Sequence, residues 1–113
     1  MALALNVFKT VTSIASTNPV GIYTAPVGYT GVVLLAQATN ITSSPQTVSF
    51  SHERTTAGVA VTTELLKDFA LPANDTANLL AGKLVLETND VMVLSADSAT
   101  GIKFLGSILE TLN

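Results

Sequence analysis

The stretch from Gly21 to Asn40 constrains the fold more than any other part of the sequence. It consists of a β-forming run at residues 21–24, a turn at residues 26–29 and an apolar run, VVLLA, at residues 32–36. A half-exposed strand alternates between apolar and polar residues, whereas a strand covered on both faces is apolar throughout. The stretch therefore predicts a hairpin whose second strand is covered on both faces, inside a sandwich or at a subunit contact.

Short β-forming runs between turn signals continue along the rest of the chain. Strands are expected at residues 6–14, 46–52, 59–64, 84–86, 91–95 and 102–112. Turns or loops are expected at residues 16–19, 40–45, 53–58, 72–76, 89–90 and 97–101, where Asn, Asp, Gly, Pro and Ser gather. Residues 65–71 fit either an extended segment or a single helical turn. Gly106, inside the last run, indicates a bulge or a close approach of two backbones.

These runs predict an all-β protein of about eight strands, because short strands at regular spacing are typical of an antiparallel β-sandwich or jelly-roll-like fold. No stretch has a helical stripe of useful length. The 113 residues, 1–113, fit a single β-sandwich domain.

Charged residues are scarce in this sequence. They make up 12% of the chain, against about 25% in an average soluble protein. A monomer in solution usually carries more charge than this, so we expect copies of the chain or a partner to cover much of the surface. The alternative is a Ser/Thr-rich β domain with no such contact. The apolar end segments give the expected interface residues: Leu3, Leu5, Val7, Ile102, Phe104 and Leu109.

Several classes of function fit the sequence poorly. The net charge is −3 and the five Lys and Arg residues are spread along the chain, so no nucleic-acid partner is expected. There is no cysteine for a disulfide or a thiolate metal site. No run approaches the roughly 20 apolar residues that span a bilayer. The apolar start, MALAL, has no basic region before it, and we do not interpret it as a signal peptide.

Candidate catalytic chemistry is limited to His52, the single histidine, which lies between Ser51 and Glu53. Neighbouring residues of a strand point to opposite faces, so these three do not form a local triad. Aspartates at the expected turns lack the spacing of a calcium loop and fit turn capping. We therefore predict no enzyme, no catalytic residue, no metal, no cofactor and no small-molecule substrate.

Five segments carry a resemblance to a known group of proteins. They are IYTAPVG at 22–28 with the apolar strand to residue 40, LKDFALPAN at 66–74, LLAGKLVLE at 79–87, NDV at 89–91, and SILE at 107–110. Together they resemble small virion structural proteins of tailed bacteriophages, including phages of cyanobacteria. At residue 89 the chain has Asn where the pattern has Gly. The likeness covers roughly residues 19–110.

The resemblance implies a β-sandwich accessory protein of a virion, assembled in the cytoplasm of a bacterial host, with no catalytic residue. Within the virion we favour a capsid decoration, or cement, protein that binds the phage major capsid protein and stabilises the shell. A homotrimer is expected, since trimers suit the local three-fold positions of icosahedral shells. The alternatives are a tail, neck or baseplate component, and a non-viral ligand-binding β-sandwich.

Overall fold

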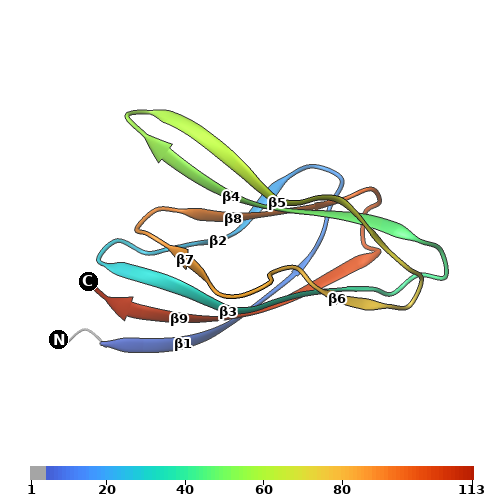
Figure 1. The fold of residues 1–113 in the computed structure, drawn as a ribbon, viewed down its shortest axis with the longest axis horizontal. Coiled ribbons are helices and arrows are strands. Elements are labelled where there is room, and N and C mark those ends of the chain that lie inside the picture. The colour runs from blue at the N-terminus through green and yellow to red at the C-terminus, as the bar shows by residue number, and fades with distance from the viewer. Residues whose placement is uncertain (1–4) are drawn as a thin grey trace.

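The computed structural model describes residues 5–113, and these residues form strands and connecting turns without any helix (Figure 1). The strands are β1 (Asn6–Ile14), β2 (Val20–Thr24), β3 (Tyr29–Asn40), β4 (Gln46–Thr56), β5 (Val59–Leu71), β6 (Thr76–Asn78), β7 (Leu84–Leu86), β8 (Val91–Ala96) and β9 (Ile102–Leu112). Every strand pair is antiparallel.

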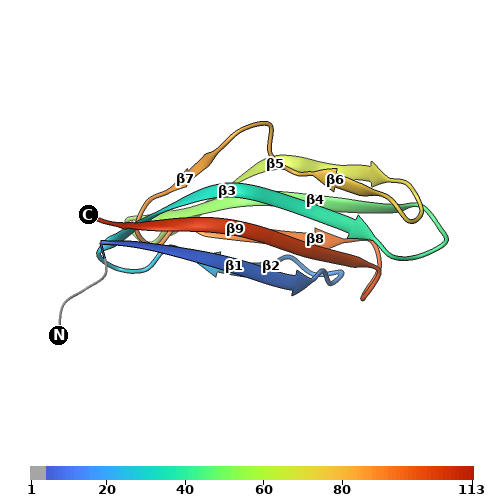
Figure 2. The ribbon, with the colours of Figure 1, turned by 90° about the horizontal axis from the view of Figure 1, so that it is seen from below.

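The strands lie in two layers, which Figures 1 and 2 show from perpendicular directions. One sheet has the order β1-β9-β3, with β6 and β7 both pairing along the remaining edge of β3; the other has the order β2-β8-β4-β5. The chain changes sheet at every connection except those between β4 and β5 and between β6 and β7. This order confirms the predicted antiparallel sandwich of jelly-roll type. The described residues form nine strands rather than about eight, because β6 begins within the turn expected at residues 72–76, whereas β7 is the strand expected at residues 84–86.

The predicted hairpin within residues 21–40 is wrong. β2 pairs with β8 in one sheet, whereas β3 pairs with β9 in the other. The turn itself is present: the Tyr29 amide donates to the Pro26 carbonyl at 3.1 Å, and Gly28 has a φ of 86°. That geometry suits a type II turn, which places glycine at its third position. Here the turn carries the chain from one sheet to the other, so the flanking strands do not pair.

The apolar run of β3 is covered on one face only within this chain. Val33 and Ala36 point into the core and are 0% and 1% exposed. The pairing of β3 with β9 shifts between Val33 and Leu35, so that Leu34 is an extra residue in a β-bulge. Leu34 is 39% exposed. The bulge explains why the sequence lacks alternation here, and a cover on the second face would have to come from another molecule.

The predicted loop at residues 53–58 is also wrong. β4 continues to Thr56, and Ala57 and Gly58 alone connect it to β5, with φ values of 53° and 79°. Two positive φ values in a two-residue connection define a type I′ hairpin turn, whose twist matches that of the flanking strands. The ambiguous segment 65–71 is extended and belongs to β5. The reason for both differences is that β4 and β5 form one long hairpin.

The core lies between the two sheets and is built from the inward-facing residues of both. Phe50 of β4 and Phe104 of β9 stack across the layers, with ring centroids 5.8 Å apart and an interplanar angle of 26°. The Phe104 ring lies over Gly106, where an added Cβ would approach it to 3.0 Å and the Leu35 carbonyl oxygen to 3.2 Å. Gly106 therefore marks a close approach, as its position in the sequence indicated, and the bulge lies on the neighbouring strand β3.

Candidate functional site

An apolar row crosses the outer face of the five-stranded sheet. In the pairing register, Phe8 of β1 is opposite Leu109 of β9, Leu109 is opposite Val32 of β3, and Val32 is opposite Val85 of β7. Directly opposite residues place their side chains on the same face of a sheet. Phe8 and Val85, at the two ends of the row, are 76% and 54% exposed. The row is therefore contiguous and open to solvent.

We call the outward-facing side of this sheet the apolar face. The alternation along each strand places the neighbours of the core residues on it. Apart from its apolar side chains it carries Thr, Ser, Asn and Gln. Among the outward-facing residues of its strands in the described part of the chain, Lys103 is the sole charged one. A surface of this kind suits contact with another protein, because depletion of charge characterises the centre of protein interfaces.

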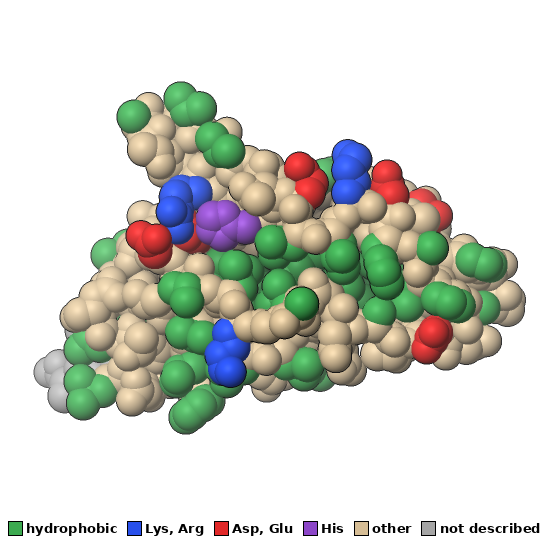
Figure 3. All heavy atoms as spheres, in the orientation of Figure 1, with side chains coloured by type: hydrophobic (Ala, Val, Ile, Leu, Met, Phe, Trp, Pro, Cys, Tyr) green, Lys and Arg blue, Asp and Glu red, His purple; other side chains and the backbone are tan. Residues whose placement is uncertain are grey.

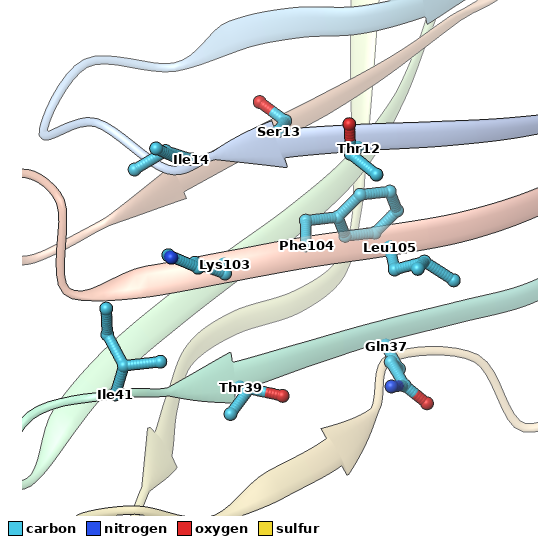
Figure 4. A pocket seen from close by; sticks show the side chains of 9 residues that line it. All are labelled: Thr12, Ser13, Ile14, Gln37, Thr39, Ile41, Lys103, Phe104 and Leu105. Atoms are coloured by element: carbon cyan, nitrogen blue, oxygen red, sulfur yellow. The ribbon is translucent and has the colours of Figure 1, made fainter.

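A hollow of about 640 Å³ lies at one end of the apolar face (Figure 4). Its lining residues come from β1, β3, β9 and the turn after β3: Thr12, Ser13, Ile14, Gln37, Thr39, Ile41, Lys103, Phe104 and Leu105. Ile14 and Ile41 are 55% and 48% exposed at its rim. The lining holds a single charged group, the Lys103 ammonium, and no carboxylate or histidine. The hollow can seat an apolar side chain of a partner but has no acid–base pair for catalysis.

Two of the residues predicted at the interface lie on the surface. Leu5, just before β1, is 69% exposed. Leu109 is half-buried and lies in the apolar row. Leu3 lies outside the described residues. Their participation in an interface stays a prediction.

The other three predicted residues point inward. Ile102 and Phe104 are 0% and 2% exposed in the core, and Val7 is half-buried on the inward-facing side of β1, opposite Glu110. Their side chains therefore point away from the apolar face, although Phe104 also borders the hollow at its end. The sequence reasoning missed Phe8, the neighbour of Val7. The period-two alternation contained that signal, because it assigned Phe8 and Val7 to opposite faces.

A polar cluster centred on Asp90 closes one end of the sandwich. Asp90 is 2% exposed. Its carboxylate accepts hydrogen bonds from Arg54 Nε at 2.9 Å and Nη2 at 2.6 Å, and from the Glu87 amide at 2.9 Å. His52 Nε2 lies 3.0 Å from the same carboxylate. The cluster joins β4 to the turn between β7 and β8, and Figure 3 shows the histidine among basic and acidic side chains.

The chemistry of this cluster is that of a structural contact. Hydrogen bonds from Arg54 hold the pKa of Asp90 well below its usual range, and these outweigh the opposing effect of burial. A carboxylate that stays ionised is a poor general acid. The neighbour Ser51 lies on the other face of β4 from His52, so the histidine has no adjacent nucleophile on this strand. Glu53 also lies on the face of β4 opposite to His52. Arg54, on the same face as His52, forms an ion pair with Asp90.

A second buried carboxylate, Glu110, joins the two sheets. The Tyr23 hydroxyl of β2 donates to Glu110 Oε2 at 2.5 Å, and Lys9 Nζ of β1 lies 3.3 Å from the same oxygen. Burial, and then the hydrogen bond to Glu110, raise the pKa of Tyr23 above its ordinary value. These groups satisfy one another inside the sandwich. They leave no unpaired polar side-chain atom buried in the described part of the chain.

Within residues 5–113, no three His, Cys, Asp or Glu side chains come together as metal ligands would. The same residues also form no helix that is long and apolar enough to cross a bilayer. The apolar face is therefore the candidate functional surface.

Comparison with known proteins gives matches in structure alone. No protein-family model and no curated protein matches the sequence. A chain of the acid-stable capsid structure of Helicobacter pylori bacteriophage KHP30 superposes with a TM-score of 0.56 at 14% identity, covering 96% of this chain and 89% of that one. A chain of the T13 viral particle of infectious bursal disease virus gives 0.54 at 10% identity, covering 97% of this chain.

The matched chains differ in length and in the assembly that they come from. This chain spans 32% of the length of the bursal disease virus chain. A subunit of Bacillus endospore appendages, described as disulfide-linked pili, matches with a TM-score of 0.51 at 15% identity over 100% of this chain and 97% of that one. The present sequence has no cysteine, so it cannot form such links. At these identities the likeness establishes the fold.

Proposed function

We propose that the protein is a structural protein of a bacteriophage virion, and specifically a capsid decoration protein that binds the major capsid protein. The observation that carries this proposal is the apolar face: a contiguous, nearly uncharged surface on one side of a jelly roll. Two of the similar folds come from viral particles, and the KHP30 capsid chain is of similar length. Both support the proposal. The protein would act without catalysis, cofactor or small-molecule substrate.

The mechanism that we propose is additive burial of the apolar face against the shell. Phe8 and Val85, more than half exposed, would be covered together with Leu109 and Val32. Full burial of one such side chain contributes roughly 1.5–3 kcal/mol, and association itself costs about 4–15 kcal/mol. A single copy would therefore bind modestly. Many copies on one lattice, linked through a trimer as we also propose, would hold neighbouring capsomers together through avidity.

The experiment that tests the role is deletion of the gene from the phage that encodes it. Particles without the protein are expected to assemble and package DNA, but to break at lower temperature, in lower salt or in chelator sooner than the parent. Deletion particles as heat-resistant as the parent would overturn the decoration role. Stable heads with missing tails or lost infectivity would instead support the tail, neck or baseplate alternative. A copy number near that of the major capsid protein is expected on a gel of parent virions.

Variants of the apolar face test the contact itself. Purified protein is added back to deletion particles, and occupancy is read from the ratio of band intensities. Phe8→Asp and Leu109→Asp should lower occupancy, because a carboxylate buried in an apolar contact carries a large desolvation cost. Val20→Asp is the matched control, since Val20 is 48% exposed on the other sheet. Equal occupancy of all variants would exclude the apolar face as the shell contact.

A further inference from the structure

The tip of the β4–β5 hairpin extends beyond the body of the sandwich (Figure 1). Pairing between β4 and β8 ends at Glu53 opposite Val91, whereas β4 and β5 remain paired to Thr56 opposite Val59. We call residues 55–63 the arm. In the described part of the chain, the arm pairs with no third strand. Figure 3 shows it as a projection that carries hydrophobic side chains near its end.

The arm has the composition of a β-strand pair but lacks the third strand that would stabilise it. Its sequence, TTAGVAVTT, has six β-branched residues and no charge. Val59 and Val61 are 62% and 58% exposed. An isolated two-stranded hairpin is marginally stable in water, and an exposed apolar edge is a template for pairing with another chain. The arm therefore has the features of an element that pairs with a further strand.

The hairpin turn determines which backbone groups of the arm face outward. In a two-residue type I′ connection the flanking residues, Thr56 and Val59, form a hydrogen-bonded pair. Because the two backbone groups of each residue point to the same side and the side alternates, the amides and carbonyls of Ala60 and Thr62 point away from β4. β5 is the edge of its sheet. These four groups are the free hydrogen-bonding positions of the arm edge.

We propose that the arms of two copies of this chain pair antiparallel through their β5 edges, around a two-fold axis at Val61. Ala60 of each copy would then exchange two hydrogen bonds with Thr62 of the second copy. Val61 would face Val61 of the second copy in a pair without hydrogen bonds. Val59 would face Thr63 of the second copy. The result is a four-stranded ribbon that joins two sandwiches.

Self-complementarity identifies a second copy as the partner. Every position from Val59 to Thr63 is uncharged, so the paired segments meet without charge repulsion although each chain has a net charge of −3. Pairs of β-branched residues across strands are favourable in sheets. Glu64, the first charged residue beyond the arm, would lie opposite the Gly58 turn of the second copy, outside the paired residues. Pairing centred on Thr62 would instead bring both Glu64 side chains into the ribbon.

The remainder of the β5 edge does not compete for this pairing. Its register against β4 shifts twice, between Phe50 and the residues on either side of it. Asp68 has a φ of 49°, and Lys67 precedes it. Bulges and charges of this kind prevent an edge from pairing with another chain. The regular, uncharged part of the edge is therefore confined to the arm.

This contact is independent of the proposed capsid role, because the arm and the apolar face belong to different sheets. A pairing of five residues is small compared with the roughly 1,200–2,000 Å² buried in stable complexes. It would be weak between free molecules and would act where copies are held side by side. Arms joined in pairs would link neighbouring copies and leave the apolar face free for another partner.

Cysteine cross-linking tests the two-fold register directly. The chain has no cysteine, so Val61→Cys introduces a single thiol. A pair without hydrogen bonds places the two Cα atoms about 4.5 Å apart, within the roughly 4.4–6.8 Å that a disulfide spans. The control is Val59→Cys in the same arm. Its two copies would be separated by four positions, or about 13 Å along the strand.

The V61C protein is expected to form covalent dimers under mild oxidation at least about tenfold faster than V59C, since only the former pair is within disulfide reach. In denaturant the two variants should oxidise at equal rates. Equal rates in the folded proteins, or faster cross-linking of V59C, would overturn the proposal. So would the absence of dimers from both, and a V61C thiol that reacts only with another virion protein would identify a different partner.

Sedimentation provides a second readout. Val61→Lys would place two ammonium groups opposite each other, so wild-type protein should sediment faster at high concentration than the V61K variant. Val20→Lys is the charge-matched control, because Val20 is 48% exposed on β2, the opposite edge of the same sheet. Association that V61K and V20K weaken equally, or that neither weakens, would refute pairing through the arm.

Discussion

Replacement of Asp90 by Asn should destabilise the protein even though the two side chains have nearly the same shape. Both carboxylate oxygens accept from Arg54: Oδ1 from Nε at 2.9 Å and Oδ2 from Nη2 at 2.6 Å. An asparagine has one accepting oxygen. Its NH₂ group therefore faces an N–H of Arg54 in either orientation, and when it takes the place of Oδ2 the contacts of that oxygen with His52 and the Glu87 amide are lost as well. Either orientation leaves donors facing donors.

The magnitude follows from the number of bonds lost and from the exposure of the partner. A hydrogen bond to a charged group contributes about 1.5–3 kcal/mol, and removing one partner of a fully buried pair costs about 3–5 kcal/mol. The Asp90 side chain is 3% exposed but that of Arg54 is 43% exposed. Water can therefore rehydrate and screen the guanidinium. We expect Asp90→Asn to lower the free energy of unfolding by about 2 kcal/mol at neutral pH.

The stability that Asp90→Asn loses relative to wild type should decrease as the pH falls. The folded-state pKa of Asp90 lies below the ordinary aspartate value, so the unfolded chain takes up this proton first as the pH falls. The carboxylate therefore contributes its full stability above about pH 5, and this contribution declines from the unfolded value of about 3.9 towards the lower folded pKa. The stabilities of wild type and Asp90→Asn should converge over that acidic range.

Urea unfolding of both proteins between neutral and acidic pH measures this difference. Asp75→Asn is the control: its carboxylate is exposed and accepts one local hydrogen bond, from the Thr76 amide. That variant should stay within about 0.5 kcal/mol of wild type. A stable Asp90→Asn protein would refute the reasoning, and so would a difference that does not shrink with acid. The first result would mean that the cluster contributes nothing beyond what water supplies, and the second would mean that the stability loss does not come from the ionised carboxylate.

Two further predictions concern the interior. Gly106→Ala should destabilise by about 1–3 kcal/mol in urea unfolding, because the added methyl group would crowd the Phe104 ring at 3.0 Å and the Leu35 carbonyl at 3.2 Å; unchanged stability would contradict the packing described. Tyr23→Phe should remove a loss of folding stability that the wild-type protein shows at alkaline pH. Because the pKa of Tyr23 is raised in the folded state, its protonated hydroxyl contributes fully to folding stability below about pH 10. This contribution is lost as the pH rises further. If wild type and Tyr23→Phe lose stability in parallel above that pH, the Tyr23–Glu110 contact is not the cause.

The class of the fold and most strand positions could be predicted from the amino-acid sequence. Residues 6–14 and 102–112 were expected as strands and form β1 and β9 with those bounds. Local chemistry suffices for such assignments, because β-branched runs favour extended backbone and Asn, Asp, Gly and Pro favour turns. Scarcity of charge led to the expectation that another molecule covers much of the surface. That cover stays a prediction, and the structure shows where exposed apolar side chains lie on the five-stranded sheet.

Strand pairing was decided by the tertiary structure. The turn at residues 26–29 has the same local geometry whether it closes a hairpin or passes from one sheet to the other. The choice depends on β8 and β9, which lie about 60 to 70 residues later in the chain and supply the partners of β2 and β3. Hydrogen bonds between strands are non-local, so no window of the sequence contains both participants.

The residues that make up the apolar face also could not be identified from the sequence alone. Alternation assigns Val7 and Phe8 to opposite faces of β1, but it does not say which face meets the other sheet. The register places Val7 opposite the buried Glu110 and Phe8 opposite Leu109. Ile102 and Phe104 look equally available in the sequence and are enclosed in the core. Burial is a property of the packed layers, because a side chain becomes buried only when a second sheet covers it.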